Sequence, residues 1–447
     1  MALTTHTRSR SGSGSGSPGP RQRVVERGTL GNGLRLVLSP DRHALVAAVA
    51  VVYDVGTRTE PEGRSGFAHL FEHLMFQGSV GLRNAAYTRH VERSGGTFRG
   101  STHLDLTQYG EVAPANALQR MLYLESDRMR GLRLTEANLA NQISVVKEEI
   151  RANVLSRPYG ALPWPRLPSL MFDTFPNTHD GRGSFADLER ATRSEAADFF
   201  DRYYAPGNAV LCVCGDFDPD RARRGIERYF GDIPARPVPA PADVREPERA
   251  GERRACYRDP LAPRPAIAWG WRVPDPIEDL DGFLPYLLLA GLLAGPDTSR
   301  LVRRLVSVDR TATSVTGRVG FLGDPFALRD PTALVFQARL PADGDPWRLL
   351  DAVDEEIERL ALDGPDPAEL DGVAARVVVK QLERTDSALG RAERLAVFEL
   401  QRDDPLLLGE LPRLLGSVGA DAVREAAGRL TPDRRSAIEV VPGAGTR

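Results

Sequence analysis

Two histidines and a glutamate stand close together in the segment 67–76, which reads Phe-Ala-His-Leu-Phe-Glu-His-Leu-Met-Phe. In a helix, their spacing of i, i+3 and i+4 puts His69, Glu72 and His73 on one face. Two neutral imidazoles four residues apart can hold one zinc ion, and the carboxylate before the second histidine can reach a water in the open coordination position. The pattern is the reverse of the His-Glu-x-x-His zinc motif, and it predicts a metal site.

A His-x-x-Glu-His pattern also arises by chance, with both histidines satisfied at a helix surface. The neighbouring residues favour a metal, because they make the other faces of the helix apolar and predict that it is buried. These neighbours are Leu70, Phe71, Leu74, Met75 and Phe76. Buried histidine and glutamate side chains need partners, and a metal ion suits all three of them.

Acidic candidates for a third metal ligand lie in a second predicted helix, over residues 136–153. This amphipathic helix contains Glu148 and Glu149 next to each other. Spacing in the sequence alone does not choose between them, so both stay candidates.

The composition limits the classes of partner. A formal net charge of −3 gives no basic footprint, which argues against nucleic acid or an anionic membrane surface. No stretch reaches the roughly 18 uncharged apolar residues of a membrane span, the longest candidate being 283–294. The N-terminus also lacks the apolar segment of a secretory signal. We therefore expect a cytoplasmic protein.

Low-complexity and proline-rich stretches divide the 447 residues into parts. A Ser/Gly/Pro composition predicts a disordered tail over 1–22, and prolines without periodicity predict a linker over 236–252. The ranges 23–235 and 253–447 repeat a similar order of predicted strands and helices, which indicates a duplicated domain. The second half has no histidine and so no copy of the metal motif. In the first half, the Val/Ala run over 45–55 predicts a central strand that is covered on both faces.

With these residues in view, the chain resembles the pitrilysin/insulinase family of zinc peptidases, in particular its short bacterial members that are similar to mitochondrial processing peptidase. The resemblance runs from about residue 23 through the second half. Besides the motif and its continuation to Ser79, it is carried by Leu124–Met129, Arg157–Gly160 and Tyr204–Ala209. It implies an α+β fold of two homologous domains of the α/β-sandwich type, each a mixed and mainly antiparallel sheet packed with helices.

The resemblance also implies which acidic residue is the third ligand. In the family this ligand is a glutamate in a later helix, and aligning the pair of valines before it puts the ligand at Glu149, with Glu148 as its neighbour. The position two turns earlier is often a second glutamate that supports the site. It is Gln142 here, which keeps hydrogen bonding but loses a charge.

The mechanism that the resemblance implies is hydrolysis of peptide bonds. His69, His73 and Glu149 would hold Zn²⁺, and Glu72 would be the general base that deprotonates a zinc-activated water. Substrate in such enzymes pairs like an added strand with a sheet edge, which would be 97–105 here. The implied activity is that of a zinc endopeptidase acting on peptides or on leader and presequence segments.

Four residues are candidate substrate contacts on this basis: Arg99, Gly100, His103 and Arg318. Relatives usually carry Asn-Ala in place of Arg99-Gly100, and Arg99 would either prefer acidic substrates or be simply solvated; we favour the solvated interpretation. His103 lies on the predicted substrate edge. Three further histidines are interpreted as surface or loop residues: His43, His90 and His179.

A partner subunit is expected from the second half. Relatives place an arginine and a tyrosine from this half near the substrate, and Arg318 here has no tyrosine behind it. Family members of this length assemble as dimers around a chamber that admits peptides, either as two copies or with a related chain that lacks the zinc motif. We expect the heterodimer rather than the homodimer.

Two other functions remain open. The same fold serves as a non-catalytic or scaffold subunit, but such a chain would have lost at least one of the four site residues, all of which are present here. An unrelated α/β protein with a structural histidine pair would require the later family segments to be coincidence.

Overall fold

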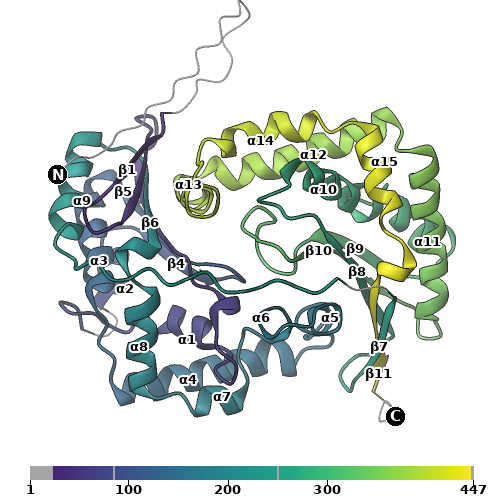
Figure 1. Ribbon diagram of the computed structural model, residues 1–447, viewed down its shortest axis with the longest axis horizontal. Helices are drawn as coiled ribbons and strands as arrows, with labels where there is room; N and C mark the ends of the chain where they lie inside the picture. Colours follow the sequence, from purple (N-terminus) through teal and green to yellow (C-terminus); the bar gives the residue numbers. More distant parts are fainter. Residues whose placement is uncertain (1–23, 84–85, 249–250, 444–447) are drawn as a thin grey trace, which may run out of the picture.

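The computed structural model describes residues 24–83, 86–248 and 251–443. Two halves, each built on one sheet with helices packed against it, face each other across the molecule (Figure 1). An extended segment over 234–248 has neither helix nor strand and runs from the first half to the second. The predicted tail over 1–22 lies outside the described residues, and the predicted domain limits stay predictions.

The first sheet has six strands in the order β1-β2-β6-β3-β5-β4. Only β2 and β6 run parallel, and every other neighbouring pair is antiparallel. The strands are β1 (Glu26–Thr29), β2 (Arg35–Pro40), β3 (Val46–Tyr53), β4 (Thr97–Thr102), β5 (Thr107–Pro114) and β6 (Ala209–Gly215). Because β4 ends this order, it is an outer strand of the sheet.

The second sheet repeats this arrangement with five strands in the order β7-β11-β8-β10-β9. Strand β11, the last of the five along the chain, lies between a parallel and an antiparallel neighbour, as β6 does in the first sheet. The strands are β7 (Arg253–Asp259), β8 (Ala266–Val273), β9 (Ser314–Val319), β10 (Thr332–Arg339) and β11 (Ser436–Pro442). The shared strand order confirms the prediction of an α+β fold with two similar, mainly antiparallel sheets.

Helices of the first half cover one face of the first sheet and surround its lower end in Figure 1. Several begin at capping side chains: Thr135 accepts a hydrogen bond from the Asn138 amide, and Thr192 and Glu195 form a capping box. The helices of the first half are α1 (Phe67–Leu74), α2 (Ala86–Arg93), α3 (Leu118–Arg130), α4 (Glu136–Ile150), α5 (Arg166–Met171), α6 (Phe175–Thr178), α7 (Phe185–Glu189), α8 (Arg193–Tyr203) and α9 (Pro219–Phe230), of which α5 packs against the second sheet.

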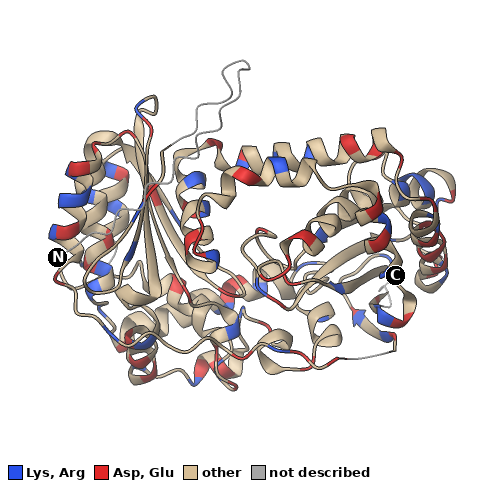
Figure 2. Ribbon diagram, turned by 45° about the horizontal axis from the view of Figure 1, so that its top comes forward, with Lys and Arg blue, Asp and Glu red and all other residues tan. Residues whose placement is uncertain are grey.

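The second half contributes longer helices, several of which begin after an aspartate cap. They are α10 (Leu280–Ala294), α11 (Pro346–Asp363), α12 (Pro367–Asp386), α13 (Ala388–Arg402), α14 (Leu407–Gly416) and α15 (Ala420–Gly428). Acidic and basic residues are interspersed on the helices of both halves (Figure 2). No described helix is long and apolar enough to cross a membrane.

Each half supplies cover for the sheet of the other. Strand β3 is buried on both faces as predicted, but one face packs against α13, which belongs to the second half. In return, the segment 159–172 of the first half packs against the second sheet, and Trp164 and Leu167 are among its buried side chains there. The two sheets are therefore joined through two reciprocal apolar contacts.

Candidate metal centre

The predicted motif lies on α1, whose start is set by a glycine. Gly66 precedes α1 with a φ of 92°, in the left-handed region that favours glycine. A Cβ atom there would lie 2.5 Å from the Cα atom of Gly183, so the approach of a later loop also requires glycine. One face of α1 is buried in the core of the first half, as predicted; it consists of Phe67, Leu70, Phe71 and Leu74. The three motif residues are left on the half-buried opposite face.

Glu149 of α4 lies opposite the two histidines. Its Oε2 atom is 3.5 Å from Nε2 of His69 and 3.4 Å from Nε2 of His73. Potential ligand atoms of these three residues lie within 4.8 Å of one another, and no other such group of three occurs among the described residues. Atoms bound to one tetrahedral zinc at about 2.0–2.2 Å are separated by roughly 3.3–3.6 Å. The donor set and its spacing therefore fit a single zinc ion.

The structure separates the two acidic candidates of α4. Glu148 points to Arg151 and its side chain is 70% exposed, whereas the neighbouring Glu149 faces α1. Gln142, the predicted supporting residue, is buried on the same helix two turns before Glu149. Sequence spacing could not make this choice, because it depends on the rotation of α4 against α1.

The charges of the cluster favour a cation. Contact with His69, and then with His73, lowers the pKa of Glu149 well below its usual value. Burial lowers the pKa of His69, but the neighbouring carboxylates of Glu149 and Glu72 outweigh it and leave the pKa of His69 raised. The carboxylates thus attract a positive charge to the space between the rings, whether it is a proton or a metal ion.

The side chain of Glu72 packs against strand β4. The hydroxyl group of Thr102 donates a hydrogen bond of 2.8 Å to Oε2 of Glu72. A Cβ atom at Gly100 would lie 3.1 Å from Cγ and 3.3 Å from Oε1 of Glu72. The predicted contact residue Gly100 therefore gives room to the carboxylate. Sequence reasoning missed Thr102, although its position two residues after Gly100, on the same face of a strand, was a usable signal.

Arg99, on the same strand, is not simply solvated, and our interpretation of it was wrong. Its guanidinium forms a bidentate ion pair with Glu393 of α13, with 2.6 Å between Nε and Oε1. The Glu393 side chain is only 6% exposed, while that of Arg99 is 55% exposed. This hydrogen-bonded pair raises the pKa of Arg99 and ties the outer strand to the second half.

His103 and Arg318 meet at Gly323, a residue of the second half. A Cβ atom at Gly323 would lie 2.6 Å from Nδ1 of His103, and Arg318 donates a hydrogen bond of 3.3 Å to the Gly323 carbonyl. Burial lowers the pKa of His103 and that of Arg318, and nearby Arg384 lowers the latter further. The two predicted substrate contacts are thus brought to one place between the halves.

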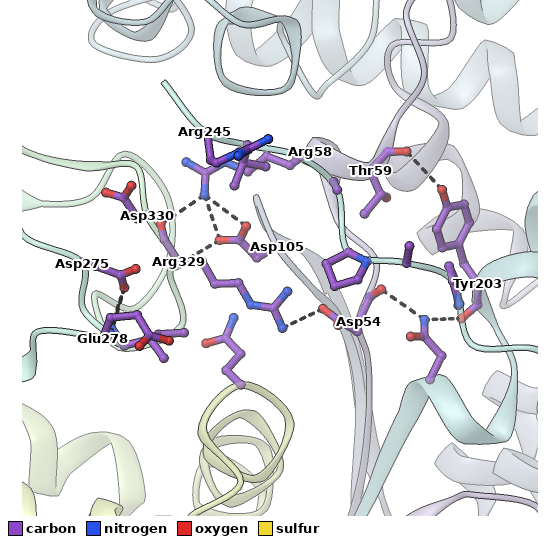
Figure 3. Close-up of a pocket in the computed structure, with 18 residues that line it drawn as sticks. Asp54, Arg58, Thr59, Asp105, Tyr203, Arg245, Asp275, Glu278, Arg329 and Asp330 are labelled. Atoms are coloured by element: carbon purple, nitrogen blue, oxygen red, sulfur yellow. Dashed lines mark hydrogen bonds and ion pairs between the residues drawn. The ribbon is translucent and has the colours of Figure 1, made fainter. Parts of the chain in front are cut away.

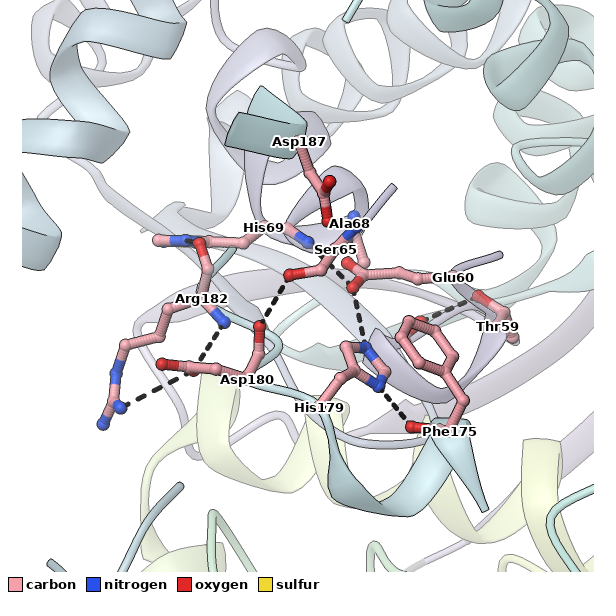
Figure 4. A network of polar contacts seen from close by, with 12 residues as sticks. Thr59, Glu60, Ser65, Ala68, His69, Phe175, His179, Asp180, Arg182 and Asp187 are labelled. Atoms are coloured by element: carbon pink, nitrogen blue, oxygen red, sulfur yellow. Dashed lines mark hydrogen bonds and ion pairs between the residues drawn. The ribbon is translucent and has the colours of Figure 1, made fainter. Parts of the chain in front are cut away.

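His179 lies in a loop, one of the two predicted settings, but its side chain is buried, which corrects the surface alternative. Its side chain is 7% exposed, and Nε2 lies 2.9 Å from Oε2 of Glu60, whose side chain is fully buried (Figure 4). Glu60 also accepts hydrogen bonds from the amides of Gly66 and Ala68 at the start of α1. Nothing in the local sequence pattern marked this pair, since its members are 119 residues apart.

A cavity of about 430 Å³ lies between the halves, away from the motif (Figure 3). Arg58 and Asp105 form an ion pair of 3.0 Å in its wall, and Arg329 pairs with Asp54 at 3.1 Å. Arg58 also donates to carbonyls of Arg329 and Pro331. None of the candidate metal ligands lines this cavity, and the contacts of Arg58 and Arg329 join the two halves there.

Comparisons with known proteins agree with this arrangement. The sequence profile of the family described as insulinase (peptidase family M16) matches residues 35–160, and that described as the peptidase M16 inactive domain matches 190–377. A relative, zinc protease PqqE of Helicobacter pylori, is 28% identical over 414 residues, which cover 90% of this chain and 89% of the relative.

More distant relatives match over shorter lengths. The mitochondrial-processing peptidase subunit beta of Lentinula edodes is 23% identical over 63% of this chain and 60% of its own. The cytochrome b-c1 complex subunit 1 of Rattus norvegicus is 25% identical over 46% of this chain and 42% of its own. The crystal structure of a protease from Helicobacter pylori superposes with a TM-score of 0.86 at 24% identity, covering 94% of this chain and all of the other, and shows the shared fold. The chain belongs to the M16 peptidase family, the pitrilysin and insulinase family that the sequence resembled.

Proposed function

We propose that this chain is a zinc-dependent endopeptidase that hydrolyses peptide bonds in peptides or in leader and presequence segments. The observation that carries the proposal is the approach of Glu149 to both histidines of α1, with Glu72 beside them. When bound, zinc supplies Lewis acidity, which polarises a carbonyl group and makes water a stronger acid.

The residues around the cluster divide the remaining work. His69, His73 and Glu149 would hold the ion through Nε2, Nε2 and a carboxylate oxygen. Glu72 would accept a proton from the attacking water and pass it to the leaving amine. The Thr102 hydroxyl leaves Oε1 of Glu72 as the oxygen for this transfer, because it occupies Oε2.

The proposed binding site for substrate is the outer strand β4. An extended peptide would add to its edge by backbone hydrogen bonds, over residues 97–105. The Arg99–Glu393 pair ties this strand to α13 of the second half. A substrate would therefore approach from the space between the halves, which favours peptides and unfolded segments over folded proteins.

We also propose a dimeric assembly, with a related chain that lacks the zinc motif or with a second copy. Two relatives are named as subunits, one of mitochondrial-processing peptidase and one of the cytochrome b-c1 complex. A cytoplasmic location stays a prediction.

A second candidate function is that of a non-catalytic or scaffold subunit. It is favoured by the match of residues 190–377 to a profile described as an inactive domain, and by the name of the cytochrome b-c1 relative. The complete set of His69, Glu72, His73 and Glu149 supports the catalytic function over this one.

The deciding experiment measures zinc by elemental analysis of the purified chain, together with cleavage of a mixed library of quenched peptides. We expect one zinc per chain and cleavage that is lost in Glu72→Gln. Glu149→Gln should lose both zinc and cleavage. The matched control Glu148→Gln, at the exposed neighbour, should keep the zinc. Zinc without cleavage would support the need for a partner, and a chain that takes up no zinc would leave the scaffold function.

A further inference from the structure

The segment 179–184, between α6 and α7, is packed tightly against the start of α1 (Figure 4). A Cβ atom at Gly183 would lie 2.9 Å from the Cα atom of Gly66, so the two backbones touch. The hydroxyl group of Ser65 donates a hydrogen bond of 3.1 Å to the carbonyl of Asp180. The segment therefore has a fixed position relative to the helix that carries the motif.

His179 opens this segment, and both of its ring nitrogens face acceptors. Nε2 lies 2.9 Å from a carboxylate oxygen of Glu60, and Nδ1 lies 2.7 Å from the carbonyl oxygen of Phe175. The ring also stacks on the Phe175 ring at 4.3 Å. Because the carbonyl can only accept, Nδ1 of His179 carries hydrogen, and the Glu60 carboxylate favours a second hydrogen on Nε2 and so the imidazolium form.

Glu60 links this imidazolium to the start of α1. It accepts hydrogen bonds of 2.8 Å from the Gly66 amide and 2.7 Å from the Ala68 amide. Such amides at a helix start have no partner within the helix and favour a negative charge. Glu60 is thus held between the positive ring of His179 and the positive end of α1.

The other end of the segment reaches a metal-ligand candidate directly. The carbonyl oxygen of Arg182 lies 3.3 Å from Nδ1 of His69. Since this oxygen accepts a hydrogen bond, it favours the form of His69 with hydrogen on Nδ1, which leaves the lone pair of Nε2 directed toward Glu149. The segment 179–184 therefore contacts α1 twice, through Glu60 and through the ring of His69.

We propose that His179 is a positioning residue for the metal centre. Its ion pair with Glu60 holds the segment against α1, so that the Arg182 carbonyl keeps His69 in the Nδ1–H form with Nε2 free to bind. A buried ion pair adds little net stability once its desolvation is counted, which favours this role over a merely structural one. The inference rests on the proposed function for the identity of the ion.

The first test is the zinc affinity of His179→Gln, measured against a competing chelator, with His43→Gln, at an exposed histidine, as the matched control. Loss of a partner that orients a metal ligand typically weakens binding about 10- to 100-fold, and we expect that loss in His179→Gln and none in the control. Combining His179→Gln with Glu60→Gln should weaken binding by less than the sum of both, because the residues act as one pair.

The second test does not depend on zinc. In metal-free protein with ¹⁵N-labelled histidine, the Nδ1 proton of His69 should be held in the hydrogen bond to the Arg182 carbonyl and exchange slowly with water. His179→Gln should speed this exchange, and His43→Gln should not. If His179→Gln does not fold, Glu60→Gln takes its place, since its amide oxygen still accepts from one of the two α1 amides.

The outcomes separate the two proposals. Unchanged zinc affinity together with unchanged exchange of the His69 ring proton in the folded variant overturns the positioning role. A wild-type chain that binds no zinc overturns the proposed function, while the ring measurement still decides on His179.

Discussion

The hydroxyl of Thr102 is the one described side-chain donor to Glu72. A hydrogen bond to a charged group is worth roughly 1.5–3 kcal/mol. Thr102→Val keeps the shape of the side chain and removes this bond, so we expect kcat to fall about 10- to 100-fold at unchanged zinc content. The measurement is steady-state cleavage of a quenched peptide.

Thr102→Ser is the control, because it keeps the hydroxyl and should retain most of the activity. If the valine variant cleaved as fast as the wild type, Glu72 would not depend on this bond for its position.

The charge of His179 makes a second prediction at this scale. Burial lowers the pKa of His179, but Glu60, then the Phe175 carbonyl and then Asp180 outweigh it and leave this pKa raised. A histidine whose folded pKa is raised contributes stability that is complete below its unfolded value of about 6.5 and is lost as the pH rises through the folded value. The loss of melting temperature caused by His179→Gln should therefore be greatest in weakly acidic buffer and shrink in alkaline buffer.

This is measured as the difference in melting temperature between metal-free wild type and variant across a pH series. His43→Gln should give a small difference with no trend, since His43 is exposed. A difference for His179→Gln that grows with pH would mean that the ring is neutral in the folded protein.

At the scale of elements, the helix α13 should govern the stability of a sheet to which it does not belong in sequence. Leu395 is 4% exposed and packs in the cluster that covers β3 and β6. Leu395→Ala leaves a cavity there, and such a change costs about 2–5 kcal/mol. We expect the amides of β3 and β6 to lose protection in hydrogen exchange, although they lie in the other half.

Leu382→Ala is the matched control, since Leu382 is also a helical leucine but is 52% exposed. Loss of protection confined to α13 and its own half would contradict the role of this helix as a shared cover.

The same scale explains what the sequence could predict. The motif could be placed on a helix because three residues at helical spacing and an apolar opposite face are local signals. The central position of β3 followed from its unbroken apolar run, yet nothing in that run told which helix covers it. The choice of Glu149 over Glu148 needed the alignment with the family, because both lie on the same helix.

Contacts between distant residues were beyond such signals. Arg99 and Glu393 are 294 residues apart, so Arg99 looked solvated. His179 and Glu60 likewise come together only when the loop after α6 packs on α1. Periodicity reports on one element at a time, and these pairs depend on how several elements are assembled.

At the scale of the whole molecule, the two reciprocal covers make the halves depend on each other. Without α13 the first sheet would expose Ala48, Ala50 and Val52, and without 159–172 the second would expose Ala268 and Val335. The connection over 236–248 has no helix or strand, and much of it is exposed. A single cut in this connection should leave one particle of unchanged size in gel filtration, and separation into two species would contradict the prediction.

Because each half covers the sheet of the other, the protein is suited to complementation between fragments. Two polypeptides divided within 236–248 and produced together should each be insoluble or poorly folded alone and should recover the metal centre only on meeting. Fusing the fragments to two proteins of interest would then turn proximity between those proteins into a zinc-binding signal.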